Sequence, residues 1–140
     1  MAKLKLIIIT PKKIALEKEI DGITVPSSEG EMTILPRHIN LFALLDEGVI
    51  HYWQKEESEY LAIGGGYVET DGETVRLLVN RAYGQEAINE EQTQKALLDA
   101  KERMKSAKTE DVRKEISSLL RRSVVDSKLL KKKRRQNTSL

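Results

Sequence analysis

Few side chains in this sequence could do chemistry. It contains two histidines, His38 and His51, and no cysteine, so disulfides, thiolate metal sites and cysteine nucleophiles are excluded. Neither histidine stands at the spacing of a metal-ligand pair or beside a nucleophile motif. His51 begins His51-Tyr52-Trp53, an alternating stretch typical of a strand. These patterns predict a chain with no catalytic residues and no metal site.

A run of three glycines, Gly64 to Gly66, could form a loop that holds a phosphate. Such a loop also needs a following Gly-Lys-Ser/Thr and a helix, whereas Tyr67 to Thr70 has the character of a strand. The run therefore predicts a bulge or a close approach of two backbone segments.

A polar segment from Glu29 to His38 is a candidate contact site. Gly30 permits a tight turn, and Pro26 and Pro36 fix φ at about −65° near its ends. The segment offers four side chains to a polar partner surface: Glu29, Glu31, Arg37 and His38. A solvated loop without a partner is the alternative that these residues alone leave open.

Basic residues gather at the carboxyl end, where residues 121–140 hold eight basic groups and a single acid, Asp126. A solvated tail, a nucleic-acid contact and a contact with an acidic protein surface are all consistent with this charge. Nucleic-acid modules usually interleave aromatic residues for stacking, and this tail has none. The basic candidates for a contact are Arg121, Arg122, Lys128, Lys131 and Lys132.

The elements that must position these residues fall into two halves. All 8 glycines, all 3 prolines and all six aromatic residues lie at or before Gly84. The remainder, from Gln85 onward, is rich in residues that favour helix. We therefore predict a β domain over residues 1–85 and a helical domain over residues 86–140.

Short alternating segments with turn signals between them predict an antiparallel β-sandwich in the first domain. Asp71-Gly72 between two such segments is a hairpin signal, because glycine supplies a positive φ without strain. The expected strands are Lys3–Thr10, Ile14–Leu16, Ile20–Val25, Met32–Leu35, Val49–Trp53, Tyr60–Ile63, Tyr67–Thr70 and Thr74–Val79.

The second domain is expected to be an antiparallel hairpin of two helices with a turn near residues 107–109. Asn89 is a predicted N-cap with Gln92 three residues later, and Thr109 is a predicted cap of the second helix. The apolar stripe of the first helix is narrow and built of small residues, so the two helices should bury little area between them. We expect them to dock on another surface or to move.

Two motifs in the β domain resemble the epsilon subunit family of bacterial F-type ATP synthase. They are Val25-Pro26, Glu29-Gly30-Glu31, Ile34-Leu35-Pro36 and His38 in one segment, and Gly65-Gly66-Tyr67-Val68-Glu69 in the other. The same family has an amino-terminal sandwich followed by two helices. The resemblance implies a non-catalytic rotor subunit of the central stalk, on the cytoplasmic face of the cell membrane. Its partners would be the gamma subunit, the ring of c subunits and the catalytic beta subunits, with no nucleic acid bound and the membrane met only through the c-ring.

The resemblance also assigns roles to the candidate residues. Glu29, Glu31, Arg37 and His38 would contact the c-ring, and the five basic residues from Arg121 to Lys132 would contact an acidic loop of the beta subunits and restrain ATP hydrolysis. One motif departs from the family: Asn89 and Gln92 stand where many members carry an Asp and an Arg associated with ATP binding. We therefore expect no cofactor. A stand-alone β-sandwich module whose basic tail contacts nucleic acid is the alternative function.

Overall fold

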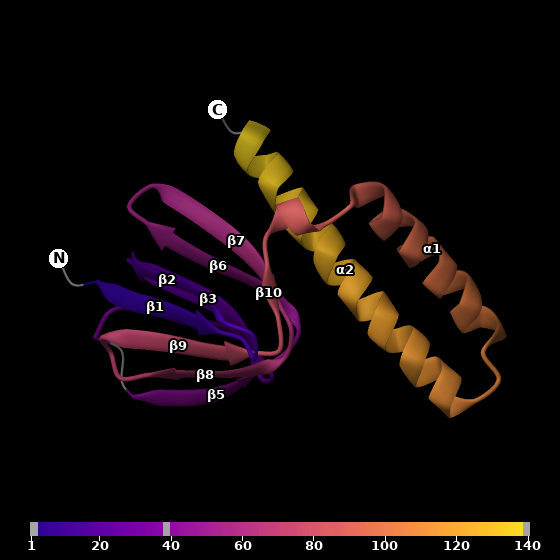
Figure 1. Cartoon of the computed structure of the whole chain (residues 1–140), viewed down its shortest axis with the longest axis horizontal. Helices are drawn as coiled ribbons and strands as arrows, with labels where there is room; N and C mark the ends of the chain where they lie inside the picture. The colour runs from indigo at the N-terminus through magenta and orange to yellow at the C-terminus, as the bar shows by residue number, and fades with distance from the viewer. Residues whose placement is uncertain (1–2, 38–39, 139–140) are drawn as a thin grey trace. The chain divides into compact units, whose positions relative to one another are not determined.

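The computed structural model describes residues 3–37 and 40–138, and side chains as far as Lys132. The chain divides into two compact units, Met1–Tyr83 and Gly84–Leu140 (Figure 1). His38, one of the four predicted c-ring contacts, lies outside the described residues.

The first unit is built from ten short strands, with no helix among its described residues. Their bounds are β1 (Leu4–Ile9), β2 (Ile14–Ile20), β3 (Gly22–Ser27), β4 (Gly30–Ile34), β5 (Leu41–Leu45), β6 (Gly48–Gln54), β7 (Glu57–Ile63), β8 (Gly66–Thr70), β9 (Thr74–Val79) and β10 (Ala82–Tyr83).

These strands form one sheet in the order β10-β7-β6-β3-β5-β8-β9-β1-β2, with β4 paired to β3. The sheet folds over where β3 meets β5 through the single pair Ser27 and Leu45, so its two halves enclose a common core. The predicted β-sandwich is therefore confirmed. One pairing differs from the antiparallel expectation: β1 runs parallel to β9, because the first strand inserts between β9 and β2.

Alternating side chains build the core. Strand β1 contributes three fully buried side chains, Leu4, Leu6 and Ile8, and β9 contributes two, Val75 and Leu77. Their neighbours in sequence point to the opposite face, as the period of two in a strand requires. His51 lies in β6, where its ring stacks on that of Tyr60 at 4.4 Å, so its interpretation as a sheet residue is confirmed.

Two strands of this unit, β5 and β10, were not predicted. The segment Leu41–Leu45 forms β5, although Leu and Ala favour helix and no polar residue marks the alternation. The strand predicted at Met32–Leu35 is confirmed but starts two residues earlier, because Gly30–Ile34 forms β4 and pairs with β3. The short strand β10 was missed because two residues carry no periodicity.

The glycine run marks a close backbone approach, as predicted. A Cβ on Gly66 would stand 2.0 Å from the carbonyl oxygen of Leu78 and 2.8 Å from Cα of Val79 on the neighbouring strand. At Gly65 the nearest atom would be 3.5 Å away, which is an ordinary contact. Of these two glycines, only Gly66 is required by the packing of β8 against β9.

The second unit contains a short 3-10 turn, η1 (Gln85–Ala87), and two helices, α1 (Glu90–Ser106) and α2 (Glu110–Thr138). The Asn89 side chain accepts a hydrogen bond from the Gln92 N–H at 2.9 Å, and Thr109 Oγ1 accepts one from the Val112 N–H at 3.2 Å, so both predicted caps are confirmed. The side-chain amide of Gln85 donates to the carbonyl of Leu129 at 2.9 Å and ties η1 to α2. None of the described helices is long and apolar enough to cross a membrane.

We predict that Gly66→Ala destabilises the sandwich, whereas Gly65→Ala does not. The added methyl at position 66 must displace backbone atoms of β9, which should cost about 1–3 kcal/mol, comparable with overpacking a core. For a domain of this size the melting temperature should fall by roughly 4 °C or more. Thermal unfolding of the two variants measures the difference. Equal melting temperatures would contradict the assigned role of Gly66.

Candidate functional site: a docking face on the sandwich

The outer face of β5, β8, β9, β1 and β2 carries an unexpected line of apolar side chains. The strand register places Leu44 opposite Tyr67, Tyr67 opposite Leu78, Leu78 opposite Ile9, and Ile9 opposite Ile14. The two ends of this apolar row are well exposed, with 60% of Leu44 and 59% of Ile14 accessible. The apolar row therefore crosses all five strands on the side away from the core.

Phe42 extends the apolar row along β5. Its side chain is 62% exposed, and its ring lies 5.0 Å from the ring of Tyr67. Phe42 and Leu44 stand two residues apart and so project from the same face of the strand. Large apolar side chains gathered on one surface typically mark a site for another protein.

A charged row runs beside the apolar row. Arg76 of β9 faces Glu69 of β8 with 4.0 Å between their charged atoms, and Lys5 of β1 pairs with Glu17 of β2 at 2.8 Å. All four side chains are about half exposed, so each pair contributes little to stability by itself. Beside an apolar row, such pairs can fix the orientation in which a partner docks.

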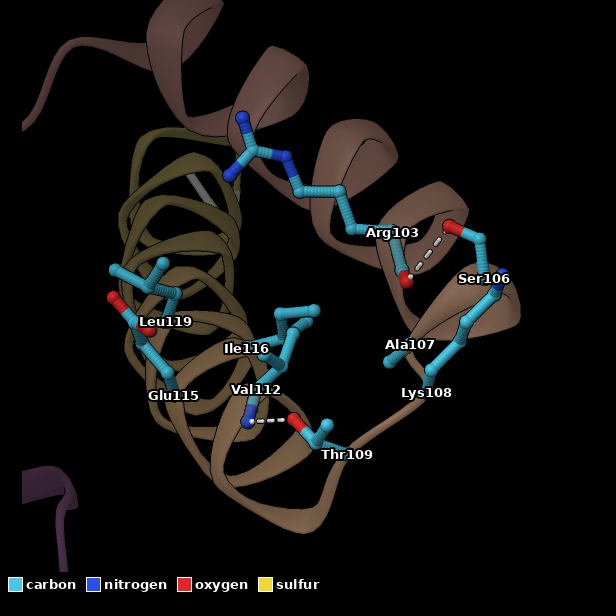
Figure 2. A pocket seen from close by; sticks show the side chains of 9 residues that line it. All are labelled: Arg103, Ser106, Ala107, Lys108, Thr109, Val112, Glu115, Ile116 and Leu119. Atoms are coloured by element: carbon cyan, nitrogen blue, oxygen red, sulfur yellow. Dashed lines mark hydrogen bonds between the residues drawn. The ribbon is translucent and has the colours of Figure 1, made fainter.

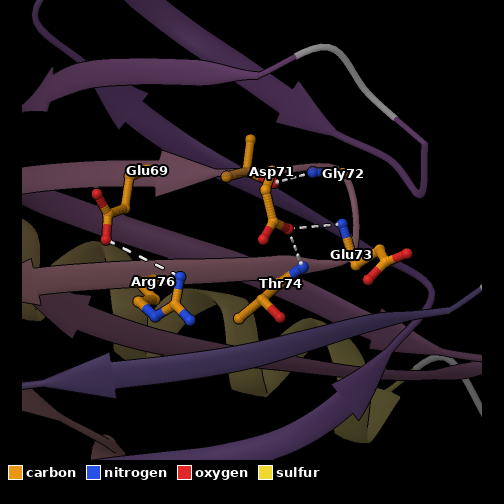
Figure 3. A network of polar contacts seen from close by, with 7 residues as sticks. Glu69, Asp71, Gly72, Glu73, Thr74 and Arg76 are labelled. Carbon is orange, nitrogen blue, oxygen red and sulfur yellow. Dashed lines mark hydrogen bonds and ion pairs between the residues drawn. The ribbon is translucent and has the colours of Figure 1, made fainter.

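The β8–β9 turn lies at one end of this face (Figure 3). One carboxylate oxygen of Asp71 accepts hydrogen bonds from the N–H groups of Thr74 at 2.8 Å and Glu73 at 2.9 Å, and these bonds lower the pKa of Asp71. The carboxylate form therefore adds stability at neutral pH that is lost as the pH falls through this lowered pKa. An open cleft of about 420 Å³ next to the turn is lined by Phe42 and Arg76 among others.

This face has the properties of a docking surface, not of a reaction centre. Its charged groups are exposed and paired with each other, and no buried acid or base points into the cleft. In the part of the chain that the structure describes, no group of three His, Cys, Asp or Glu side chains could hold a metal ion.

The structure separates the predicted c-ring contacts. Glu29 lies in the β3–β4 turn, where its N–H donates to Ser27 Oγ at 3.2 Å, and Glu31 follows on β4 opposite Pro26. Arg37 lies beyond the other end of β4, where its N–H donates to the carbonyl of Gly72 in the β8–β9 turn at 3.0 Å. Glu29 and Glu31 therefore lie at one end of β4, and Arg37 lies beyond the other end.

The predicted basic contacts lie on α2. Arg121, Arg122, Lys128, Lys131 and Lys132 are all exposed. A pocket of about 380 Å³ opens where α1 turns into α2, lined by Arg103, Lys108, Val112, Leu119 and five others (Figure 2). Asn89 and Gln92, at the other end of α1, do not line it. Its mixed lining shows no preference for a particular ligand.

Sequence reasoning missed the docking face. The one signal available was the uninterrupted apolar run Leu41–Leu45, in which no polar residue shows which side is exposed. The other members come from four strands, and only the pairing register brings them into a row.

Comparisons with known proteins agree with this architecture. Residues 3–85 match the family described as ATP synthase, Delta/Epsilon chain, beta-sandwich domain. An ATP synthase epsilon chain of Herpetosiphon aurantiacus is 35% identical over 94% of this chain and 96% of the relative. One of Carboxydothermus hydrogenoformans is 37% identical over 73% of this chain and 76% of the relative.

A chain in the structure of the Euglena gracilis mitochondrial ATP synthase, OSCP/F1/c-ring in rotational state 1, superposes with a TM-score of 0.79. The two chains are 24% identical, and the match covers 86% of this chain and 77% of the other, which shows a shared fold. Fold and sequence together define a subunit of a rotary ATP synthase. The chain belongs to the family of ATP synthase delta and epsilon chains.

Proposed function

We propose that this chain is the epsilon chain of a bacterial F-type ATP synthase, a non-catalytic subunit of the central stalk that rotates with the c-ring. Its sandwich binds the gamma subunit, and its place is on the cytoplasmic face of the membrane, reached only through the c-ring. Family membership over the full β domain supports this role.

The observation that carries the gamma contact is the exposed apolar row with Phe42 beside it. A stalk subunit must transmit torque without slipping, so it needs a broad surface fixed to its neighbour. Docking of gamma on the apolar row removes apolar area of both subunits from water. The Glu69–Arg76 and Lys5–Glu17 pairs fix the orientation in which gamma docks.

The c-ring contact belongs, in this proposal, to the β3–β4 turn. Glu29 and Glu31 share that turn, and Gly30 between them has φ of 122°, which only glycine adopts readily. Arg37 lies at the other end of β4, beside the β8–β9 turn, so we propose the c-ring role for the two acids and not for Arg37.

The helical unit acts as the brake on ATP hydrolysis. Helix α2 has 29 residues against 17 in α1, so α1 cannot cover its whole length. The exposed basic side chains on α2 suit an acidic surface of the catalytic beta subunits. Asn89 caps α1 through its side-chain oxygen, and with Gln92 it stands where the family motif has an Asp and an Arg, so we expect no ATP binding there.

We predict that Phe42→Ser with Leu44→Ser weakens binding of the gamma subunit. Burying the exposed parts of two such side chains should contribute about 2–3 kcal/mol, which is roughly a 30- to 150-fold change in the dissociation constant. Isothermal titration with gamma measures it.

Leu35→Ser is the matched control, because Leu35 is 49% exposed but packs near Gly22 of β3, on the other half of the sheet. Equal losses in the control and the double variant would show that the apolar row is not the docking face.

We predict that Arg121→Gln, Arg122→Gln and Lys128→Gln together raise ATP hydrolysis by the assembled enzyme. Exposed ion pairs contribute about 0.2–1 kcal/mol each, so three lost pairs should release at least about threefold more activity. The effect should shrink in high salt, which screens such pairs.

The control variant removes the same charge from α1 by Lys95→Gln, Lys101→Gln and Lys105→Gln, three exposed positions. A rise of equal size in this control, or none in the α2 variant, would contradict a brake built on α2.

A further inference from the structure

The edges of the sheet differ in how they are protected from other strands. An unpaired edge is a template for strand addition, and proteins usually guard it with charges, proline, bulges or short length. Strand β2 carries Glu17, Lys18 and Glu19, β10 has two residues, and β4 contains Glu31. Strand β5, with the sequence LFALL, has no charge and no proline.

One edge of β5 is open along most of its length. All five residues pair with β8 on one side. On the other side, among the described residues, β5 pairs only with the end of β3, through the pair Leu45 and Ser27 and a hydrogen bond from the Ser28 N–H to the Leu44 carbonyl at 3.0 Å.

The direction of the backbone groups follows from that bond. In an antiparallel strand, the N–H and C=O of alternate residues point to the same edge. Since the Leu44 carbonyl points toward β3, the N–H and C=O of Phe42 point to the same, open side. The groups of Ala43 point to β8. Phe42 therefore offers one donor and one acceptor beside an exposed ring.

We infer that β5 receives an extended strand of the gamma subunit, which adds to the sheet at Phe42 by main-chain hydrogen bonds. The occupant is an extended segment with apolar side chains at alternate positions, because Phe42 and Leu44 project from one face of β5 at 62% and 60% exposure. This edge is continuous with the apolar row through Leu44. The inference rests on the gamma contact proposed above and specifies how that contact is made.

Amide hydrogen exchange of the whole chain, free and bound to purified gamma, tests the inference by NMR. In the free chain the Phe42 amide should exchange fast and the Ala43 amide slowly, because only the second is bonded to β8. On binding gamma, exchange at Phe42 should slow by at least about tenfold while Ala43 changes little.

Two variants distinguish a main-chain hydrogen bond between Phe42 and gamma from burial of Phe42 under gamma without such a bond. Phe42→Ala removes the ring and keeps the N–H, whereas Phe42→Pro removes both and is tolerated at a strand edge. Strand addition predicts that Phe42→Pro binds gamma at least about fivefold more weakly than Phe42→Ala. Slow exchange at Ala43 in both variants confirms that they fold. If the Phe42→Pro variant does not fold, the test is the change in Phe42 amide exchange when the unaltered chain binds gamma.

Equal affinities of the two folded variants, or unchanged exchange at Phe42 in a complex that does form, would overturn strand addition and leave the gamma contact standing. Failure of gamma to bind the unaltered chain would overturn the proposed function and this inference together. Slowed exchange at Phe42 that appears when the free chain alone is concentrated would assign the edge to a second copy and overturn the assignment to gamma.

Discussion

The fold depends on a sheet whose second half, formed by β5, β8, β9, β1 and β2, carries apolar side chains on its outer face as well as in the core. Strands β1, β8 and β9 bury Leu6, Val68 and Leu77 in the core, yet each of them also contributes one residue to the apolar row on the outer face, beside the charged pairs. A sheet that faces water on one side normally carries polar residues there. The inner face makes the unit fold, and the outer face is the surface that we propose for docking.

The helical unit follows a different rule. On α1 only the small residues Thr93 and Ala100 are buried, whereas the described part of α2 buries three larger apolar side chains as well as Ser123: Ile116, Val125 and Leu129. Because α1 buries only small side chains, it removes little apolar area from water in its contact with α2. Caps at Asn89 and Thr109 define each helix by itself. We propose that the packing of α1 on α2 can be exchanged for another surface, as the proposed brake requires.

The sequence predicted the elements whose signals are local. The division near Gly84, the Asp71-Gly72 hairpin, both helix caps and most strands follow from turn residues, alternation and capping chemistry. It could not predict features set by register. Strand β5 carries five apolar residues, so no alternation separates its core side from its exposed side. The parallel pairing of β1 with β9 and the separation of Glu29 from Arg37 likewise depend on which strands become neighbours.

We propose that the sandwich alone docks on the gamma subunit and that the helices are the regulatory part. The most direct measurement compares the affinity of gamma for the full chain and for a chain ending at Gly84, by isothermal titration, after checking that the shorter chain unfolds cooperatively. We expect dissociation constants that agree within about threefold, a difference of less than 1 kcal/mol. A cooperatively folded shorter chain that fails to bind gamma would contradict it.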